Sequence, residues 1–554
     1  LALKYQGRYN EAYDRFYKSC WNAAWQDAGY FACAQIATMQ GRLEDALDEV
    51  DRSLIRNWHN HKARALKTAI LRRMGRTEEA LQLIEDSLAI DKFNFGCRYE
   101  KYLITNVVDE LSVMKEMMRG EPHNYDEIAL DYCAAGCWQE AASLWNIAIA
   151  EGIVTPMTYY YLGWCLHQGG LSGVKQAFAD AVKACPDYCF PNRLEAILAL
   201  QCAMVQNPDD ARAPYYLGNL YYDKRQYDLA MEAWETSARL DGSFPTVWRN
   251  LALAYFNKLN RPEEAVLLLE KAFRLDPTDA RVLMELDQLY KRLNRPHTER
   301  MAFLEQYMDI VITRDDLYLE YVTLLNQTGQ YREAIRRIDQ RKFHPWEGGE
   351  GKVPAQYQIA RLELAKELIA RKEYDEALIR IEECYAYPPH LGEGKLPGAQ
   401  ENDFNYYKAC ILQQLGKQKE AHDLFLKASM GDSQPAAAMY YNDQKPDKIF
   451  YQGLAFRKLG QEKEARSRFN KLITYGEEHL FDIFRMDYFA VSLPDLLIWE
   501  DDMDKKNRIH CNYLMALGHL GLGNTAKAEL FFEVAASMDN NHQGIQIHRK
   551  LMNT

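Results

Sequence analysis

Apolar and polar residues follow one another along this chain in a unit that returns at a fixed interval. The sequence GRYNEA begins at Gly7, GRLEDA begins at Gly41 and GRTEEA begins at Gly75, so both steps are 34 residues long. A fixed period of this length predicts a stack of short helix pairs joined by tight turns. Later copies of the turn are GCWQEA at Gly136, RQYDLA at Arg225, NRPEEA at Asn260, GQYREA at Gly329, KEYDEA at Lys372, GKQKEA at Gly416, GQEKEA at Gly460 and GNTAKA at Gly523.

Each position of the turn has a physical role. Glycine or asparagine at its start suits the left-handed conformation that ends a helix. The acidic residues that follow in most copies are expected in the first turn of the next helix, where the helix dipole favours negative charge. The closing alanine lets two helices approach closely. The pattern therefore predicts helix, turn, helix in every unit.

The clearest unit is APYYLGNLYYDKRQYDLAMEAWETSARLDG, residues 213–242. Its marker residues are Leu217, Gly218 and Tyr221 on the first helix, and Tyr227, Ala230 and Trp234 on the second. The markers of the next unit are Trp248, Leu251, Tyr255, Ala265, Ala272 and Pro277. These residues resemble the tetratricopeptide repeat (TPR) family, whose pattern is Trp, Leu-Gly, Tyr, then Ala, Phe, Ala and Pro. The resemblance implies an all-α fold, a right-handed α-α superhelix or TPR-like solenoid, in which each unit contacts only its neighbours.

The spacing of the turns divides the chain into five predicted segments. Residues 1–91 hold regular repeats, and residues 92–210 hold divergent repeats with an irregular joint at PDYCFPN. Residues 211–340 are regular again. In residues 341–480 the period lengthens to 44 residues, from Lys372 to Gly416 to Gly460, and the extra residues form GEGK-containing loops. Residues 481–554 hold a final repeat and a capping helix.

Composition and charge limit the partners that we expect. The chain has 554 residues and a formal net charge of −12, without a Lys/Arg tract, which disfavours nucleic acid and anionic membranes as partners. No apolar run of about 18 residues and no signal peptide are present, so we predict a cytoplasmic location. The chain starts at Leu1, already inside a repeat, which predicts the C-terminal part of a larger protein with a further domain or targeting signal upstream.

The sequence gives no indication of catalysis, a metal or a cofactor. The twelve cysteines are scattered without a zinc-site spacing and indicate buried thiols in a reducing compartment. His59 and His61 are two positions apart and cannot chelate together on a helix. The GEGK loops lack the first glycine and the hydroxyl residue of a phosphate-binding loop. We therefore expect structural loops or partner contacts there, the latter through Trp346, Lys352, His390 and Lys395.

The first helices carry a second set of candidates, because their exposed side lines the concave groove in the TPR family. Tyr160 and Trp164 are four residues apart, and Tyr215, Asn219 and Tyr222 also share one helix face. Arg249 and Asn250 occupy corresponding positions of the next unit. Aromatic rings with amides suit an extended peptide or a sugar, and packing between helices is the alternative.

TPR domains that bind chaperone tails hold a carboxylate with Lys and Asn of the first unit, Asn of the second unit, and Lys and Arg of the third unit. This chain is similar at Asn219, Asn250 and Arg281 but has Tyr215 and Glu285 in place of two cations. Because Glu285 would repel a carboxylate, we do not predict that clamp.

A further resemblance concerns residues 190–230, the GEGK loops and AQEND at residues 399–403. They resemble the repeat region of a bacterial family in which a mutarotase-like β-sandwich precedes the repeats. Two functions follow as hypotheses. The first is a non-catalytic scaffold that binds a protein or peptide partner, including its own missing N-terminal domain. The second is an accessory module of a carbohydrate-active enzyme that binds glycan, or the catalytic domain, through the aromatic groove.

Overall fold

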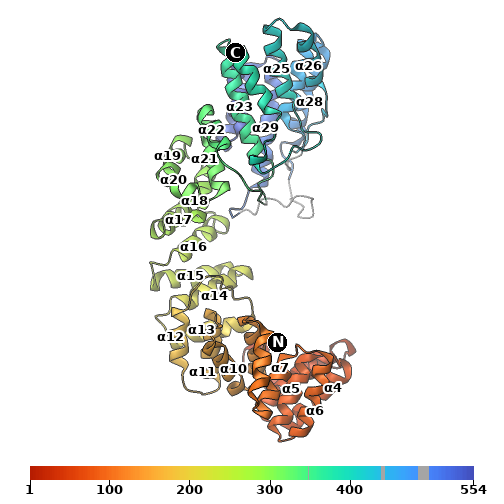
Figure 1. Ribbon diagram of the computed structural model, residues 1–554, viewed down its shortest axis with the longest axis vertical. Coiled ribbons are helices and arrows are strands. Elements are labelled where there is room, and N and C mark those ends of the chain that lie inside the picture. Colours follow the sequence, from red (N-terminus) through yellow and green to blue (C-terminus); the bar gives the residue numbers. More distant parts are fainter. Residues whose placement is uncertain (347, 438–442, 484–497, 554) are drawn as a thin grey trace. The chain divides into compact units, whose positions relative to one another are not determined.

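The computed structural model describes residues 1–346, 348–437, 443–483 and 498–553 (Figure 1). Parts of the predicted insertions at residues 344–354 and 431–447 and of the predicted final segment lie outside these ranges. Every regular element within them is a helix, so the all-α, TPR-like fold predicted from the period is confirmed.

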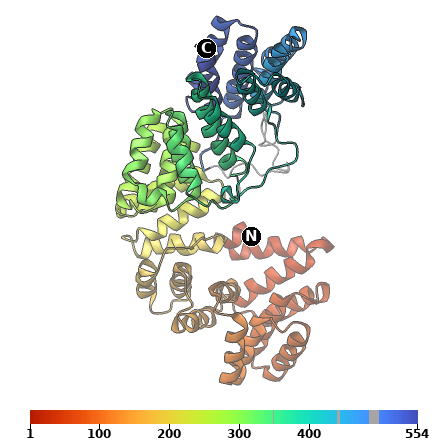
Figure 2. The same ribbon diagram turned by 45° about the horizontal axis from the view of Figure 1, so that its top comes forward.

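The chain divides into two compact units, Leu1–Val247 and Trp248–Thr554. In unit 1 the helices stack as successive antiparallel pairs (Figure 2). Its helices are α1 (Ala2–Tyr5), α2 (Tyr9–Ser19), η1 (Ala23–Trp25), α3 (Gln26–Met39), α4 (Leu43–Arg56), α5 (His61–Arg73), α6 (Thr77–Ile90), α7 (Phe95–Thr105), α8 (Val108–Met118), α9 (Pro122–Ala134), α10 (Trp138–Ala150), α11 (Pro156–Gln168), α12 (Val174–Lys183), α13 (Leu194–Gln206), α14 (Arg212–Asp223) and α15 (Tyr227–Leu240).

Unit 2 continues the pairs from α16, which crosses the border between the units. Its helices are α16 (Pro245–Asn257), α17 (Pro262–Leu275), α18 (Ala280–Arg292), α19 (His297–Gln306), α20 (Met308–Val311), α21 (Asp315–Gln327), α22 (Tyr331–Asp339), α23 (Lys352–Ala370), α24 (Tyr374–Cys384), η2 (Pro389–Leu391), α25 (Asn402–Gln414), α26 (Gln418–Ser429), α27 (Pro446–Lys458), α28 (Glu462–His479), α29 (Met503–Gly521), α30 (Thr525–Met538), α31 (Gln543–Arg549) and η3 (Lys550–Asn553).

The repeated turn adopts the conformation that its sequence predicts. Gly41, between α3 and α4, has a φ of 74°. The first turn of α4 contains Glu44 and Asp45, where negative charge is favoured. In the clearest unit, the predicted first and second helices are α14 and α15.

A glycine of the first helix allows the two helices of a pair to touch. A Cβ atom placed on Gly218 would lie 2.4 Å from the ring of Trp234 on α15. Gly163 stands in the same relation to Phe178, and Gly453 to Phe469. The glycine of the Leu-Gly marker therefore allows close contact between a backbone and a large ring, and Gly453 does the same after Gln452.

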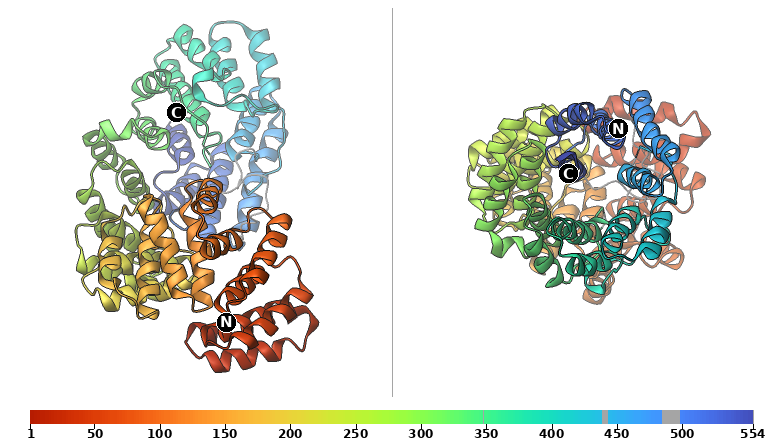
Figure 3. Two further views of the ribbon diagram at one scale, coloured as in Figure 1. Left: turned by 60° about the horizontal axis from the view of Figure 1, so that its bottom comes forward. Right: turned by 90° about the horizontal axis from the view of Figure 1, so that it is seen from above.

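The C-terminal end of unit 2 packs against earlier helices of the same unit. Gln543 of α31 exchanges side-chain hydrogen bonds with Gln356 of α23, and the Nζ of Lys550 donates to the hydroxyl of Tyr331 at 2.8 Å. Figure 3 gives two further views of the ribbon diagram, in which the C-terminal end is marked. The predicted capping helix therefore packs on helices that precede it by about two hundred residues.

Candidate functional site

The structure places Tyr160 in the core of unit 1, not on a groove surface. Its side chain is fully buried, its hydroxyl donates to the carboxylate of Asp210 at 2.9 Å, and its ring packs edge-on against Tyr216. Burial raises the pKa of this hydroxyl well above its usual range. The side chain of Tyr160 is thus engaged within the protein, and its contact with a ligand stays a prediction.

Trp164 and Tyr215 are also committed mainly to packing. Each retains only 8% of its surface exposed. The ring of Trp164 meets that of Trp138 at 5.9 Å, and the ring of Tyr215 meets that of Phe244 at 4.8 Å, both edge-on. The alternative of packing between helices thus describes these two residues better than stacking on a sugar.

Asn219 and Tyr222 both contact the ring of Trp234, on the second helix of their own unit. The Nε1 of Trp234 donates to the Oδ1 of Asn219 at 3.0 Å. The ring of Tyr222 lies 5.3 Å from that of Trp234 and 5.0 Å from that of Tyr227. Both residues are half-buried, and these contacts orient α15 on α14.

Arg249, in unit 2, forms a two-pronged ion pair. Its Nε and Nη2 each donate to a carboxylate oxygen of Glu285 at 2.6 Å. Glu285 is fully buried and also accepts from the Nε of Arg281 at 3.0 Å, while Asn250 accepts from Arg249 at 3.3 Å. Glu285, which departs from the carboxylate-clamp pattern, thus pairs with two arginines within the protein.

The two GEGK loops pack against each other. The backbone N–H of Gly351 donates to the carboxylate of Glu393 at 2.7 Å, and the N–H of Phe343 donates to the carbonyl of His390 at 2.8 Å. Burial raises the pKa of Glu393. These contacts hold successive repeats together.

The predicted contact residues of these loops lie in different settings. Trp346 is half-buried and covers Gly349. His390 lies 3.7 Å from the carboxylate of Asp339, and Lys395 pairs with Glu401. Lys352 is exposed at the start of α23. We retain Lys352 and Lys395 as solvent-facing candidates, whereas Trp346 and His390 contribute to packing.

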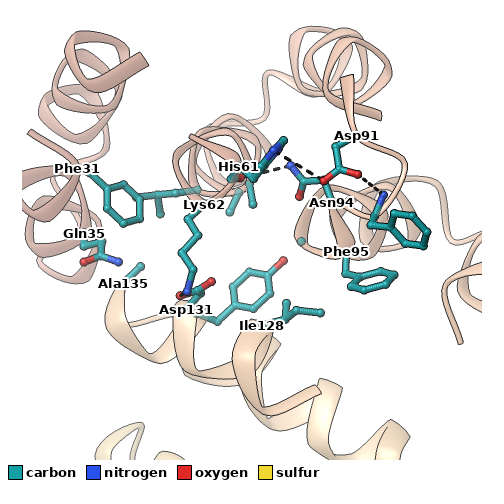
Figure 4. Close-up of a pocket in the computed structure, with 16 residues that line it drawn as sticks. Phe31, Gln35, His61, Lys62, Asp91, Asn94, Phe95, Ile128, Asp131 and Ala135 are labelled. Atoms are coloured by element: carbon teal, nitrogen blue, oxygen red, sulfur yellow. Dashed lines mark hydrogen bonds and ion pairs between the residues drawn. The ribbon is translucent and has the colours of Figure 1, made fainter. Parts of the chain in front are cut away.

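A cavity that the sequence did not reveal lies among the first helices of unit 1 (Figure 4). It has a volume of about 190 Å³ and is formed by α3, α5, α7 and α9. Its lining includes the aromatic residues Phe31, Phe93, Phe95 and Tyr132, the apolar residues Ala65, Leu66, Ala69, Ile128 and Ala135, and the polar residues Gln35, His61, Lys62, Asp91, Asn94 and Asp131, together with Gly96.

Small residues explain why space remains there. Ala65 and Ala69 are four residues apart on α5 and so share one face. A Cβ atom on Gly96 would lie 2.7 Å from the Cβ of Ala65, so α7 approaches α5 at its start. Two alanines on one face of a first helix are the sequence signal for this cavity, but it becomes visible only when four helices are placed together.

Polar and charged groups at the cavity lie close to one another. The Nζ of Lys62 lies 2.8 Å from a carboxylate oxygen of Asp131, and the Nε2 of His61 lies 3.7 Å from that of Asp91. The side chain of Asn94 donates to the carbonyl of His61 and accepts from the backbone of Cys97. The site therefore combines apolar walls with a rim of both charges.

Within the described ranges, no group of three or more His, Cys, Asp or Glu side chains is arranged to hold a metal ion. Among the same residues, no helix is both long enough and apolar enough to cross a bilayer.

Comparison with known proteins finds similarity to tetratricopeptide repeats in one part of the chain. The family model of the tetratricopeptide repeat matches residues 192–243 and 215–280, which include the clearest unit. The TPR domain of P58(IPK) is 11% identical, and the match covers 88% of this chain and 98% of that one at a TM-score of 0.24. A tetratricopeptide repeat protein from Parabacteroides merdae is 14% identical over 54% of this chain and 98% of its own, also at 0.24.

A third match is YrrB, described as a TPR protein with an unusual peptide-binding site. It is 16% identical over 43% of this chain and 96% of its own, at a TM-score of 0.17. At these TM-scores no ligand or partner transfers to this chain. Residues 192–280 are similar to tetratricopeptide repeats in sequence, and the chain is an all-α array of TPR-like helix pairs.

Proposed function

We propose that this protein is a non-catalytic scaffold that binds an extended segment of a partner protein, and that the cavity of unit 1 receives one side chain of that segment. Helical repeat arrays commonly use their concave faces for such binding. The observation that supports the proposal is the cavity among α3, α5, α7 and α9, formed by the first helices of successive repeats.

The size of the cavity favours a peptide over other ligands. Pockets for small molecules usually have volumes of about 300–1,000 Å³. At about 190 Å³ the cavity is smaller, and it suits one large apolar side chain. The paired charges at its edge, such as Lys62 with Asp131, can exchange partners with the polar groups of a peptide backbone.

The alternative functions have weaker support. The aromatic residues expected to stack on a glycan, Tyr160, Trp164 and Tyr215, are buried. A glycan would therefore have no exposed platform among these three residues. TPR arrays are generally non-catalytic, which agrees with the proposal.

Peptide selection followed by substitution tests the proposal. A displayed library of random peptides is selected on the protein, and the dissociation constant of the best peptide is measured by calorimetry. Phe95→Asp, which places a charge at the cavity wall, is expected to weaken binding at least tenfold, or about 1.4 kcal/mol. The reason is that a carboxylate would have to be desolvated beside the apolar anchor.

The matched control is Ile55→Asp. Ile55 lies on α4 of the same unit and is 78% exposed, so the same chemical change there leaves the dissociation constant unchanged. Circular dichroism checks that both variants are folded. Equal binding by both variants, or selection of oligosaccharides but no peptides on parallel arrays, would contradict the proposal.

A further inference from the structure

In unit 2, the first helices α16 and α18 hold a short stretch of the same chain, residues 498–502. Its sequence is Ile-Trp-Glu-Asp-Asp, and it lies directly before α29. The stretch has no helical structure, and we call it the strap. It meets α16 and α18 more than two hundred residues away in sequence.

One side chain of α16 makes two hydrogen bonds to the backbone of the strap. The Nδ2 of Asn257 donates to the carbonyl of Ile498 at 2.9 Å, and its Oδ1 accepts from the N–H of Glu500 at 2.8 Å. Both bonds are made to main-chain atoms, so they can hold an extended segment whatever its side chains. Peptide-binding proteins use main-chain bonds for affinity in this way and side-chain pockets for specificity.

Trp499 is buried against α16 and α18, and we call the space that its side chain fills the aromatic pocket. The residue is fully buried, its Nε1 donates to the backbone carbonyl of Glu285 on α18 at 3.0 Å, and its ring packs edge-on against Phe256 at 5.2 Å. A buried tryptophan with its N–H satisfied is the usual form of an anchor residue in a binding site.

Charges complement each other along the rest of the strap. Lys258 pairs with Glu500. The Nη2 of Arg292, at the end of α18, donates to the carboxylate of Asp501 at 2.9 Å and to the carbonyl of Trp499 at 3.2 Å. Basic groups on the repeats therefore face acidic groups on the strap.

We infer that the surface between α16 and α18 is a second peptide site, selective for an aromatic residue followed by two acidic residues, and that the strap is its built-in ligand. An external segment of this chemistry binds only when it displaces the strap. The three features of a peptide site, namely a backbone clamp, an aromatic pocket and charge complementarity, carry this inference. The site belongs to unit 2 and does not depend on the cavity of unit 1.

A synthetic Ile-Trp-Glu-Asp-Asp peptide with an N-terminal fluorophore tests the inference through fluorescence anisotropy. The full chain with Trp499→Ala has lost the anchor of its strap, so it is expected to bind the peptide at least tenfold more tightly than the unsubstituted chain. Adding Asn257→Ala to that variant removes the backbone clamp and is expected to reverse the gain. A peptide with alanine in place of tryptophan serves as the ligand control.

A second variant protects the test against loss of folding. Glu500→Lys with Asp501→Lys weakens the strap but keeps its tryptophan, and it is also expected to bind the peptide more tightly than the unsubstituted chain. Circular dichroism identifies which variants are folded. If the folded variants bind the peptide no better than the unsubstituted chain, the strap is only a structural connection and the inference is wrong. Phe95→Asp should not alter this binding, which separates the two sites.

Discussion

Arg300 lies at the centre of a buried ion cluster in unit 2. Its side chain is fully buried and donates to the carboxylates of Asp287 and Glu320, and to the carboxamide of Asn541 at 2.8 Å. Burial alone would raise the pKa of Glu320, but Lys291 and Arg300 lower it to about 2. The cluster joins α18, α19 and α21 to the returning C-terminal end.

Replacing Arg300 with methionine leaves the buried carboxylate of Asp287 without its paired cation, whereas Glu320 keeps its ion pair with Lys291. Removal of one partner from a buried ion pair costs about 3–5 kcal/mol, so we expect a loss of this size in the free energy of unfolding. Chemical denaturation of the full chain, followed by circular dichroism, measures it. Arg336→Met is the control, because Arg336 pairs with Glu333 at the surface and its loss should leave the midpoint nearly unchanged. Equal effects of the two changes would show that the cluster contributes nothing special.

At the same scale, the sequence predicts which residues share a helix face, but it does not predict which neighbours they contact. The spacing of Tyr160 and Trp164 correctly indicates one helix face, but it does not tell which neighbouring helix covers that face. The sequence predicts that Arg249 contacts a ligand, and the structure adds an ion pair with Glu285, one repeat further along. Such pairings depend on how two units stack, which the spacing within one helix cannot specify.

At the scale of elements, the turn between paired helices is the most regular feature. Most copies place glycine at the left-handed position, as at Gly41, but Arg225 and Lys372 occupy it with φ values of 59° and 65°. A side chain in this conformation costs about 1–2 kcal/mol relative to the right-handed one. The period allowed the helix pairs and turns to be predicted, since each copy repeats the same local physics.

Arg225→Gly should therefore stabilise the protein. We expect a gain of about 0.5–1 kcal/mol, because relief of the strained conformation exceeds the greater backbone freedom of glycine in the unfolded chain. Thermal unfolding followed by calorimetry measures the change. Lys224→Gly, one residue earlier at a φ of −82°, relieves no strain and should bring no gain. A gain in both variants would point to a cause other than the left-handed backbone.

At the scale of the whole molecule, the two units differ in what fills the space beside their first helices. In unit 1 the first helices surround the cavity described above. In unit 2 the strap and the C-terminal end lie against earlier helices, with Asn294 bonded to Asn540 and Gln327 bonded to Asn541, and a second cavity of about 250 Å³ lies beside the C-terminal end. These contacts have no counterpart in the 34-residue period. The period predicts the repeating fold. It predicts neither the cavity nor the packing of the C-terminal end, because these features do not repeat.

The most direct test of the proposed scaffold function locates a bound peptide on the chain. The selected peptide carries a photoreactive benzophenone in place of its apolar anchor, and cross-linked residues are identified by mass spectrometry. We predict cross-links to residues that line the cavity on α3, α5, α7 and α9, and their loss when unlabelled peptide is added in excess. Cross-links confined to the second helices α4 and α6, or to unit 2, would contradict the account.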